Sequence, residues 1–242
     1  MKIYAVGIGP GSERHLTPAA RQAIIESDVI VGYTPYLEWI TDLTQGKQLI
    51  STGMKGEIRR CEQAFDQSEQ GKQVAVVSSG DAGIYGMAAL LLEMAEHRPG
   101  VEIVVVPGVT ASTSAASLLG SPLANDYAVI SLSDLLTPWP KIEKRLEAAA
   151  LGDFVVCLFN PKSRKRSEHL TKACEILGQH KPPHTWCGYA TNALREGEQY
   201  TLCTLAELPT MPIDMMTTVI VGNSETRRIN NRLVTTRGYR IP

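Results

Sequence analysis

Several turns rich in glycine and other small residues follow apolar runs that have the character of buried strands. They are GIGPG (7–11), SSGDAGIYG (78–86), PGVTAS (107–112) and ISLSD (130–134). Glycine allows backbone to approach a ligand closely because it has no Cβ atom. Ligands of open α/β sheets bind outside the carboxyl ends of the strands. The turns therefore predict a binding pocket lined by exposed backbone groups.

The first turn differs from a dinucleotide-binding loop. Such a loop reads G-x-G-x-x-G and runs directly into a helix. Here the spacing is G-x-G-P-G, and Pro10 stands where an N–H would be offered to a pyrophosphate. Proline has no N–H to donate. We therefore expect the loop to approach a ligand other than a phosphate.

Asp81 is the only carboxylate inside the three turns that contain glycine, GIGPG, SSGDAGIYG and PGVTAS. A single carboxylate among backbone donors suits a cationic or hydroxyl-rich group, such as an α-amino group or a ribose. The alternative is that Asp81 caps the N-terminus of the helix that follows it, as aspartate often does. The sequence leaves both interpretations open.

The elements that carry these turns alternate between strand and helix patterns through the first part of the chain, which is typical of an α/β layered sheet. Beyond residue 152, three strand candidates at short spacing favour a more antiparallel sheet: 184–191, 198–205 and 215–223. We expect two α/β domains, 1–122 and 125–242, joined near SPLAND (121–126). The expected helices include 17–28, with Thr17 as N-cap, and also 57–71, 84–97 and 162–180.

The composition of the 242 residues is that of a globular protein, with 43% hydrophobic and 20% charged residues. The net charge of −1 gives no basic field for nucleic acid. Neither a membrane-length apolar run nor a signal-peptide pattern is present. The cysteines (Cys61, Cys157, Cys174, Cys187 and Cys203) lack C-x-x-C spacing, so we expect buried thiols in a reducing cytoplasm.

These motifs and their order along the chain resemble those of the tetrapyrrole methylase family. GIGPG, SSGDAGIYG and PGVTAS, followed by a second-domain strand that ends in LFNP (158–161), match that family over most of the chain. The resemblance implies two α/β domains with S-adenosylmethionine in a trough between them. It implies a homodimer as well. Carried onto this sequence, the cofactor-binding positions are Pro10, Gly80, Asp81, Ile84, Thr110, Ala111, Asn160 and Ala193.

Longer strings, such as SGDAGIYGMA (79–88) and SLSDLLTPW (131–139), resemble one subgroup of the family. That subgroup methylates carbon 17 of precorrin-3B or cobalt-factor III in cobalamin biosynthesis and contracts the ring. Methyl transfer from a sulfonium needs positioning more than a strong base, whereas contraction needs proton transfer. The candidate acids and bases are Asp81, His15, Ser133 and Asp134. A surface role for His15 and a capping role for Asp134 are the competing interpretations.

The implied substrate carries many carboxylates, which Arg and Lys side chains bind well. The run KSRKR (162–166) follows LFNP at a strand end, where it would border the trough; a solvated surface is the alternative. We expect these residues to contact the substrate: Gly9, Gly11, Arg14, Lys55, Lys162, Arg164 and Arg195.

Other classes of function remain as alternatives. A sister methylase could act on another corrin carbon or on uroporphyrinogen III, and a non-catalytic tetrapyrrole-binding protein could keep the fold. His97, His169, His180 and His184 share no spacing, and we interpret them as surface or packing residues. We predict no metal site formed by the protein, no nucleic-acid partner and no membrane partner; any metal arrives inside the tetrapyrrole.

Overall fold

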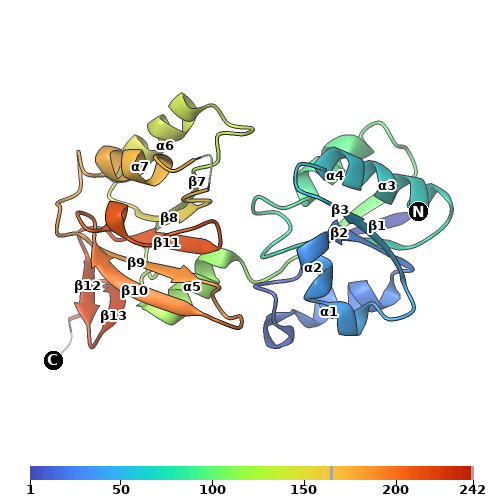
Figure 1. The fold of residues 1–242 in the computed structure, drawn as a ribbon, viewed down its shortest axis with the longest axis horizontal. Coiled ribbons are helices and arrows are strands. Elements are labelled where there is room, and N and C mark those ends of the chain that lie inside the picture. The colour runs from blue at the N-terminus through green and yellow to red at the C-terminus, as the bar shows by residue number, and fades with distance from the viewer. Residues whose placement is uncertain (164–165, 241–242) are drawn as a thin grey trace. The chain divides into compact units, whose positions relative to one another are not determined.

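Figure 1 shows the computed structural model of the chain, which describes residues 1–163 and 166–240. The chain forms two compact units, Met1–Ala111 and Ser112–Pro242. The boundary between the units, after Ala111, lies closer to the N-terminus than the join expected near SPLAND. That segment belongs to the second unit because the C-terminal part of the chain holds it. Thr235 Oγ1 donates to the carbonyl of Pro122 (2.6 Å), and Asn125 Nδ2 donates to the carbonyl of Thr236 (3.1 Å).

The first unit is built on a five-stranded sheet in which every described pairing is parallel, in the order β3-β2-β4-β1-β5. Parallel strands bring all their carboxyl ends to one edge of a sheet, so the glycine turns that follow β1, β4 and β5 meet there. The strands are β1 (Lys2–Gly7), β2 (Val29–Tyr33), β3 (Gln48–Thr52), β4 (Val74–Ser78) and β5 (Glu102–Val106).

Helices cover both faces of this sheet (Figure 1). Side chains of a strand point alternately to opposite faces, so Val74 and Val76 of β4 pack on one side and Ala75 and Val77 on the other. This explains why the strand reads as a continuous apolar run. The helices are α1 (Pro18–Glu26) and α2 (Thr34–Glu38) on one face, and α3 (Glu57–Glu69) and α4 (Ala88–Ala95) on the other.

Two helix starts in this unit show how local sequence sets the boundaries. Thr17 caps α1 as expected, because its Oγ1 accepts the N–H of Ala20 at 3.1 Å. In contrast, α4 begins at Ala88, and the expected start at residue 84 is wrong. Tyr85 has a positive φ of 56°, and a Cβ on Gly86 would lie 2.5 Å from the carbonyl oxygen of Ala82. The IYG segment therefore forms a turn that leads into the helix.

The second unit contains a mixed five-stranded sheet in the order β10-β9-β11-β8-β7. Its β7 and β8 are parallel, whereas β11 runs antiparallel to both β8 and β9, and β10 is antiparallel to β9. The antiparallel character expected beyond residue 152 is confirmed. The strands are β7 (Tyr127–Ser131), β8 (Val155–Phe159), β9 (Trp186–Thr191), β10 (Gln199–Thr204) and β11 (Thr217–Val221).

The faces of the second sheet are covered in different ways. Helices α6 (Trp139–Leu151) and α7 (His169–Leu177) pack on one face, and α5 (Ala111–Leu119) packs on the other with β13. The small sheet β12-β13-β6 joins β12 (Thr226–Ile229), β13 (Arg232–Thr235) and β6 (Gly120–Ser121). The expected start of α7 at residue 162 is wrong, because Ser163 and Arg166 pair through their backbones before the helix begins.

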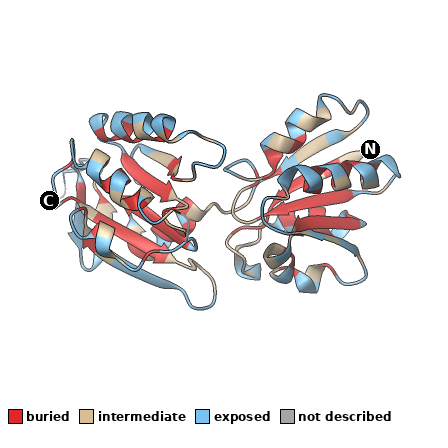
Figure 2. Ribbon diagram, turned by 45° about the horizontal axis from the view of Figure 1, so that its top comes forward, coloured by how far each residue is buried: buried red, intermediate tan, exposed pale blue. Residues whose placement is uncertain are grey.

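Both sheets are buried along their central strands, as the red ribbons of Figure 2 show. Each buried Val, Leu or Ile side chain contributes about 1.5–3 kcal/mol relative to an exposed one. All the cysteines are buried, as expected, and burial raises the pKa of Cys61, Cys157, Cys174 and Cys203 to about 12. Within the described residues, no helix combines the length and apolar character that crossing a membrane requires.

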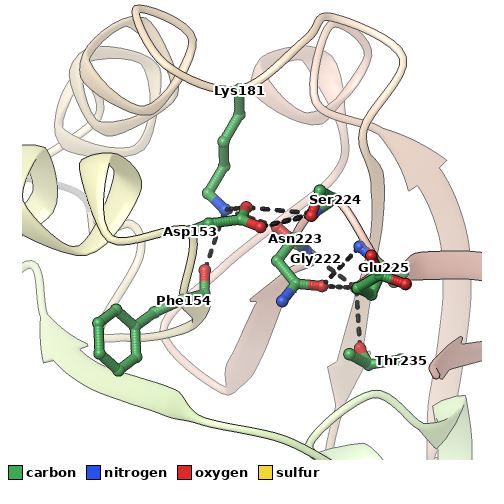
Figure 3. Close-up of polar contacts among 9 residues, drawn as sticks. Asp153, Phe154, Lys181, Gly222, Asn223, Ser224, Glu225 and Thr235 are labelled. Atoms are coloured by element: carbon green, nitrogen blue, oxygen red, sulfur yellow. Dashed lines mark hydrogen bonds and ion pairs between the residues drawn. The ribbon is translucent and has the colours of Figure 1, made fainter. Parts of the chain in front are cut away.

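The buried Lys181 bonds to the segments before β8 and after β11 (Figure 3). These segments lie at the edge of the second sheet opposite the carboxyl end of β8. Lys181 Nζ donates to the carbonyls of Phe154 (2.9 Å) and Gly222 (3.0 Å), and it lies 3.6 Å from the Asp153 carboxylate. Asp153 in turn accepts from the backbone N–H of Ser224. Desolvation lowers the pKa of Lys181, and the nearby Asp153 opposes that effect. The network fixes the start of β8 against the end of β11.

Candidate active site

The three glycine turns of the first unit meet through their backbones. Gly9 and Gly80 form a short antiparallel bridge, in which each N–H donates to the other carbonyl at 3.0 and 2.7 Å. Ile8 N–H donates to the carbonyl of Ser78 at 2.9 Å. Gly9 and Gly80 both have positive φ values, 68° and 67°, which glycine adopts without strain. The turns after β1 and β4 are thus joined into one surface.

The turn after β5 joins this surface through Gly108. A Cβ on Gly108 would collide with the carbonyl oxygen of Gly80 and would lie 2.5 Å from that of Gly7. A Cβ on Gly7 would lie 2.7 Å from the Gly108 nitrogen. Only glycine lets these strand ends pack backbone against backbone. The convergence that the spacing of the motifs predicted is therefore present in the first unit.

Asp81 connects two of the turns. Its Oδ1 accepts the N–H of Gly83 at 2.8 Å, and its Oδ2 accepts the N–H of Gly108 at 3.0 Å. Both oxygens are thus engaged by backbone donors, one from its own turn and one from the turn after β5. The side chain is not a simple helix cap, because α4 begins only at Ala88. Asp81 fixes the distance between the two loops.

The other expected cofactor positions of this unit lie around that joint. Gly80, Pro10, Thr110 and Ala111 are half-buried, and Ile84 is 38% exposed. The surface here is thus formed by small side chains, turn backbone and the branched apolar side chain of Ile84. Such a surface offers apolar contact and backbone hydrogen-bonding groups to a ligand.

The candidates His15, Arg14, Gly11 and Lys55 lie on two loops of the first unit. Ser12 Oγ lies 2.7 Å from His15 Nδ1, within hydrogen-bonding distance, and the His15 carbonyl packs against Gly9. Arg14 shares the short 3-10 helix Glu13–His15 and is exposed. Gly11, with a φ of 105°, forms the preceding bend. Lys55 is exposed, with a φ of 66°, in the turn after β3.

In the second unit, Asn160 and Ser133 are brought together by a residue that did not feature among the candidates. Asn160 Nδ2 donates to Ser131 Oγ at 2.9 Å, and the Ser133 N–H donates to the same oxygen at 3.2 Å. Asn160 has a φ of 53°, a left-handed conformation that asparagine tolerates. Ser131 therefore links the ends of β7 and β8.

Asp134 is paired with a histidine. His169 Nε2 lies 3.2 Å from Asp134 Oδ2. Desolvation raises the pKa of Asp134, but the hydrogen bond from His169, a backbone hydrogen bond and the charge of Arg166 lower the pKa below its ordinary value. His169 also packs edge-on against Trp139, so it has a packing role, and the pairing with Asp134 adds a contact to the interpretation of this residue. Sequence spacing offered no signal for this pair, because α6, β8 and the loops around them separate the two residues along the chain.

The remaining candidates also follow strand ends of the second sheet. Ala193 lies between Asn192 and Leu194, which have φ values of 50° and 60°. Arg195 Nη2 donates to Asn192 Oδ1 at 3.2 Å. Lys162 Nζ donates to the carbonyl of Pro209 at 3.3 Å, so part of its donor capacity is used within the protein. Arg164 lies outside the described residues.

In each unit, taken by itself, the strand ends form a surface suited to binding and orienting a ligand. Within the described residues, no group of three or more His, Cys, Asp and Glu side chains is arranged to hold a metal ion. The polar side chains near the strand ends mostly fix loops: Asp81 joins two turns, Ser131 joins two strands, and His169 holds Asp134. Chemistry that depends on placing two reactants matches such a surface.

The sequence matches the family described as tetrapyrrole (corrin/porphyrin) methylases over residues 2–209. It is 46% identical over 240 residues to the "Probable cobalt-factor III C(17)-methyltransferase" of Salmonella typhimurium, covering 99% of this chain and 100% of that protein. It is 47% identical to the "Cobalt-factor III methyltransferase" of Priestia megaterium. That match covers 98% of this chain and only 45% of the relative, so the chain spans about half of the Priestia protein.

Solved structures agree in fold. The methyltransferase CobJ superposes with a TM-score of 0.91 at 37% identity, covering 97% of this chain and 98% of that one. A uroporphyrin-III C-methyltransferase from Thermus thermophilus, solved in complex with S-adenosylhomocysteine, shares the fold. Its TM-score is 0.74 at 20% identity, covering 92% of this chain and 97% of that one. From the family match and these relatives we conclude that the chain belongs to the tetrapyrrole (corrin/porphyrin) methylase family.

Proposed function

We propose that this chain methylates carbon 17 of cobalt-factor III and contracts the corrin ring, using S-adenosylmethionine, in cobalamin biosynthesis. The observation that carries the proposal is the 46% identity over the whole length of a relative named as a probable cobalt-factor III C(17)-methyltransferase. Identity to CobJ is lower, at 37%. The name of the Salmonella relative favours the cobalt-containing substrate over precorrin-3B, with the metal arriving as part of that substrate.

Members of this family use S-adenosylmethionine, which supplies an activated methyl group when bound. The joined turns of the first unit fit such a cofactor. They present turn backbone, small side chains and a partly exposed Ile84. In the proposal, Pro10, Gly80, Ile84, Thr110 and Ala111 bind the adenosine and methionine parts. Asp81 keeps the two binding turns at a fixed spacing through Gly83 and Gly108. Asn160 and Ala193 are the proposed contacts from the second unit.

The substrate contributes its own nucleophile, so the protein's part in methyl transfer is orientation. Backbone of Gly9 and Gly11 shapes the first unit's surface for the ring, and Arg14, Lys55, Lys162, Arg164 and Arg195 are the proposed partners of its carboxylates. Because proton transfer accompanies contraction, His15, Ser133 and Asp134 remain the proposed acid–base groups. Asp134, with its lowered pKa, is ionised at neutral pH and accepts protons or hydrogen bonds. Both oxygens of Asp81 already accept backbone bonds, which favours a positioning role.

The proposal is tested by anaerobic incubation with methyl-labelled S-adenosylmethionine and two substrates in parallel, cobalt-factor III and metal-free precorrin-3B. Mass spectrometry follows both the label and the ring-contracted product. We expect label in the cobalt substrate. Label in precorrin-3B alone would assign the chain to the metal-free reaction. Label in neither, with S-adenosylhomocysteine bound in calorimetry, would indicate a sister substrate or a tetrapyrrole carrier.

The assembly and location of the enzyme are also proposals. The family resemblance implies a homodimer, which sedimentation at micromolar concentration tests directly. We propose the cytoplasm as its location, in keeping with cysteines that remain buried thiols. A monomer at all concentrations tested would overturn the dimer without affecting the assignment of the reaction.

A further inference from the structure

The loop that joins β7 to α6 starts beside the proposed cofactor residue Asn160. The last residues of β7 and β8, Ser131 and Phe159, are paired in the sheet. Ser131 Oγ accepts the side chain of Asn160 at 2.9 Å, and the Leu132 N–H donates to the carbonyl of Phe159 at 2.9 Å. The loop thus leaves the sheet at the carboxyl ends of β7 and β8, where parallel strands place ligands.

Contacts on both sides hold this loop in one position. Leu132 is fully buried in the core between the sheet and the two helices α6 and α7. Asp134 is bound by His169 at the start of α7. Trp139, at the start of α6, meets the ring of the same histidine edge-on, with ring centroids 4.6 Å apart. His169 therefore contacts both ends of the segment that lies between Asp134 and Trp139.

That segment carries two leucines whose side chains are exposed to solvent. Leu135 is 64% exposed and Leu136 is 97% exposed. Single exposed leucines are common on proteins, but here two are adjacent on a segment whose two ends both contact His169. An apolar pair held in solvent at a strand-end edge is typical of a surface that binds an apolar partner.

The same edge of the second sheet carries further groups of matching character. β11 runs antiparallel to β8 and β9, so the residues before it, Met215 and Met216, lie at the edge where β8 and β9 end. They are 41% and 47% exposed, and the Met216 carbonyl accepts the N–H of Asn192 at 3.2 Å. Lys162 follows β8, and Arg195 follows β9. Apolar side chains and cations thus share this edge.

We propose that Leu135 and Leu136 contact the face of the tetrapyrrole ring, and that His169 is a positioning residue that holds their loop through Asp134. The inference rests on the proposed function and names the substrate-contacting element of that site. A flat apolar macrocycle with carboxylates at its rim is complementary to two leucines that share one sheet edge with Lys162 and Arg195. His169 acts on substrate binding only through the loop.

The leucines are tested by the double change Leu135→Ser with Leu136→Ser, which affects exposed side chains and spares the core. The matched control is Leu151→Ser, because Leu151 is 71% exposed at the far end of α6. We expect the KM for cobalt-factor III to rise about tenfold or more. The affinity for S-adenosylhomocysteine and the KM of the control should match the wild type.

The histidine is tested by comparing His169→Ala with His169→Gln. The amide nitrogen of glutamine can take the place of His169 Nε2 toward Asp134, whereas alanine removes the donor. We expect His169→Ala to raise the KM for the tetrapyrrole, and we expect the KM of His169→Gln to lie close to the wild-type value. Adding His169→Ala to the double leucine variant should raise the KM little further, because both changes disable the same element.

The outcomes separate the inference from the function on which it rests. A wild-type chain that methylates cobalt-factor III, together with a double leucine variant of unchanged KM, would overturn the inference alone. So would a double variant that loses the homodimer in sedimentation, because the leucines would then belong to a subunit interface. Tetrapyrrole binding is followed by the absorbance of the ring. A wild-type chain that neither methylates nor binds a tetrapyrrole would overturn both the inference and the proposed function.

Discussion

At the scale of single residues, Asp81 illustrates how a charged group at a binding surface can act through the backbone. The sequence left open a direct role toward a cation or hydroxyl group and a capping role. The structure shows a third arrangement, in which the carboxylate accepts N–H groups from Gly83 and Gly108 on two different turns. Hydrogen bonds to charged groups contribute about 1.5–3 kcal/mol each.

We predict that Asp81→Ala lowers the free energy of unfolding by about 1–3 kcal/mol, because the part-buried N–H of Gly108 and the exposed N–H of Gly83 lose their acceptor. We expect weaker binding of S-adenosylhomocysteine in calorimetry, since the two turns lose their fixed spacing. Asp81→Asn keeps one acceptor oxygen and should fall between alanine and the wild type. Asp66→Ala, on the exposed side of α3, is the control. Unchanged unfolding with weakened binding would instead support a direct contact with the cofactor.

Lys181 gives a prediction about pH in the second unit (Figure 3). Lys181→Met leaves the carbonyls of Phe154 and Gly222 without their donor, so we expect a loss of about 2–4 kcal/mol in the free energy of unfolding. Desolvation lowers the pKa of this lysine in the folded state below 10.5. Between the two pKa values the unfolded chain binds more protons, and wild-type stability therefore rises with pH.

The stability gap between wild type and Lys181→Met should consequently widen from neutral pH toward pH 10.5. Urea unfolding at pH 7 and at about pH 9.5 measures it. Lys144→Met on the exposed face of α6 provides the control, with a gap near zero at both pH values. A Lys181→Met gap that stays constant or narrows would show that burial does not disfavour the charged form.

The pair formed by Asp134 and His169 shows what the sequence could not provide at this scale. The motif SLSDLLTPW drew attention to Asp134 by its residue types. Its partner lies at the start of α7, and only the packing of α6 and α7 on the same face of the sheet brings it near. Local patterns predict which residues begin and end an element. They do not predict which ends of distant elements meet.

At the scale of elements, the strand-end turns were the most predictable feature of the fold. Each glycine turn follows an apolar run, and parallel strands must bring such turns to one edge. The starts of α4 and α7 were less predictable, because apolar spacing continued through segments whose backbone takes another course. In α4 the deciding features are the positive φ of Tyr85 and the close approach of Gly86 to Ala82.

The close packing of the turns predicts the effect of a single methyl group. Gly108→Ala would place a Cβ against the carbonyl oxygens of Gly80 and Gly7, so the turn after β5 must move away from the other two. We expect a loss of about 1–3 kcal/mol in stability and a clear loss of affinity for S-adenosylhomocysteine. Gly53→Ala is the matched control, because a Cβ there meets nothing within 4 Å. Equal behaviour of the two variants would mean that the turns rearrange without consequence for binding.

At the scale of the whole molecule, alternation of strands and helices predicted the α/β class. The short spacing of strands beyond residue 152 predicted the antiparallel pairings of the second sheet. The join near SPLAND did not coincide with the structural division. β6 pairs with β13, and residues 113 positions apart are joined where Thr235 binds Pro122. A short segment rich in turn residues looks like a linker when its distant partner is unknown.

Each of the four clusters of buried residues that the structure describes draws its members from one unit only. Leu91 belongs to a core of the first unit, and Leu146 belongs to a core of the second. Both are fully buried, so truncation to alanine should cost about 2–5 kcal/mol in either case. Because a core holds together only the elements that contribute to it, we expect the two units to open as separate cooperative units.

Native-state hydrogen exchange of the full chain, followed by peptide mass spectrometry, tests this expectation. In Leu146→Ala, protection should fall in peptides from β7, β8, β9 and β11 and stay at the wild-type level in β1, β2 and β4. Leu91→Ala should give the reverse pattern. If either substitution lowered protection equally in both sheets, the chain would unfold as one cooperative body. The division of its core side chains would then have no thermodynamic counterpart.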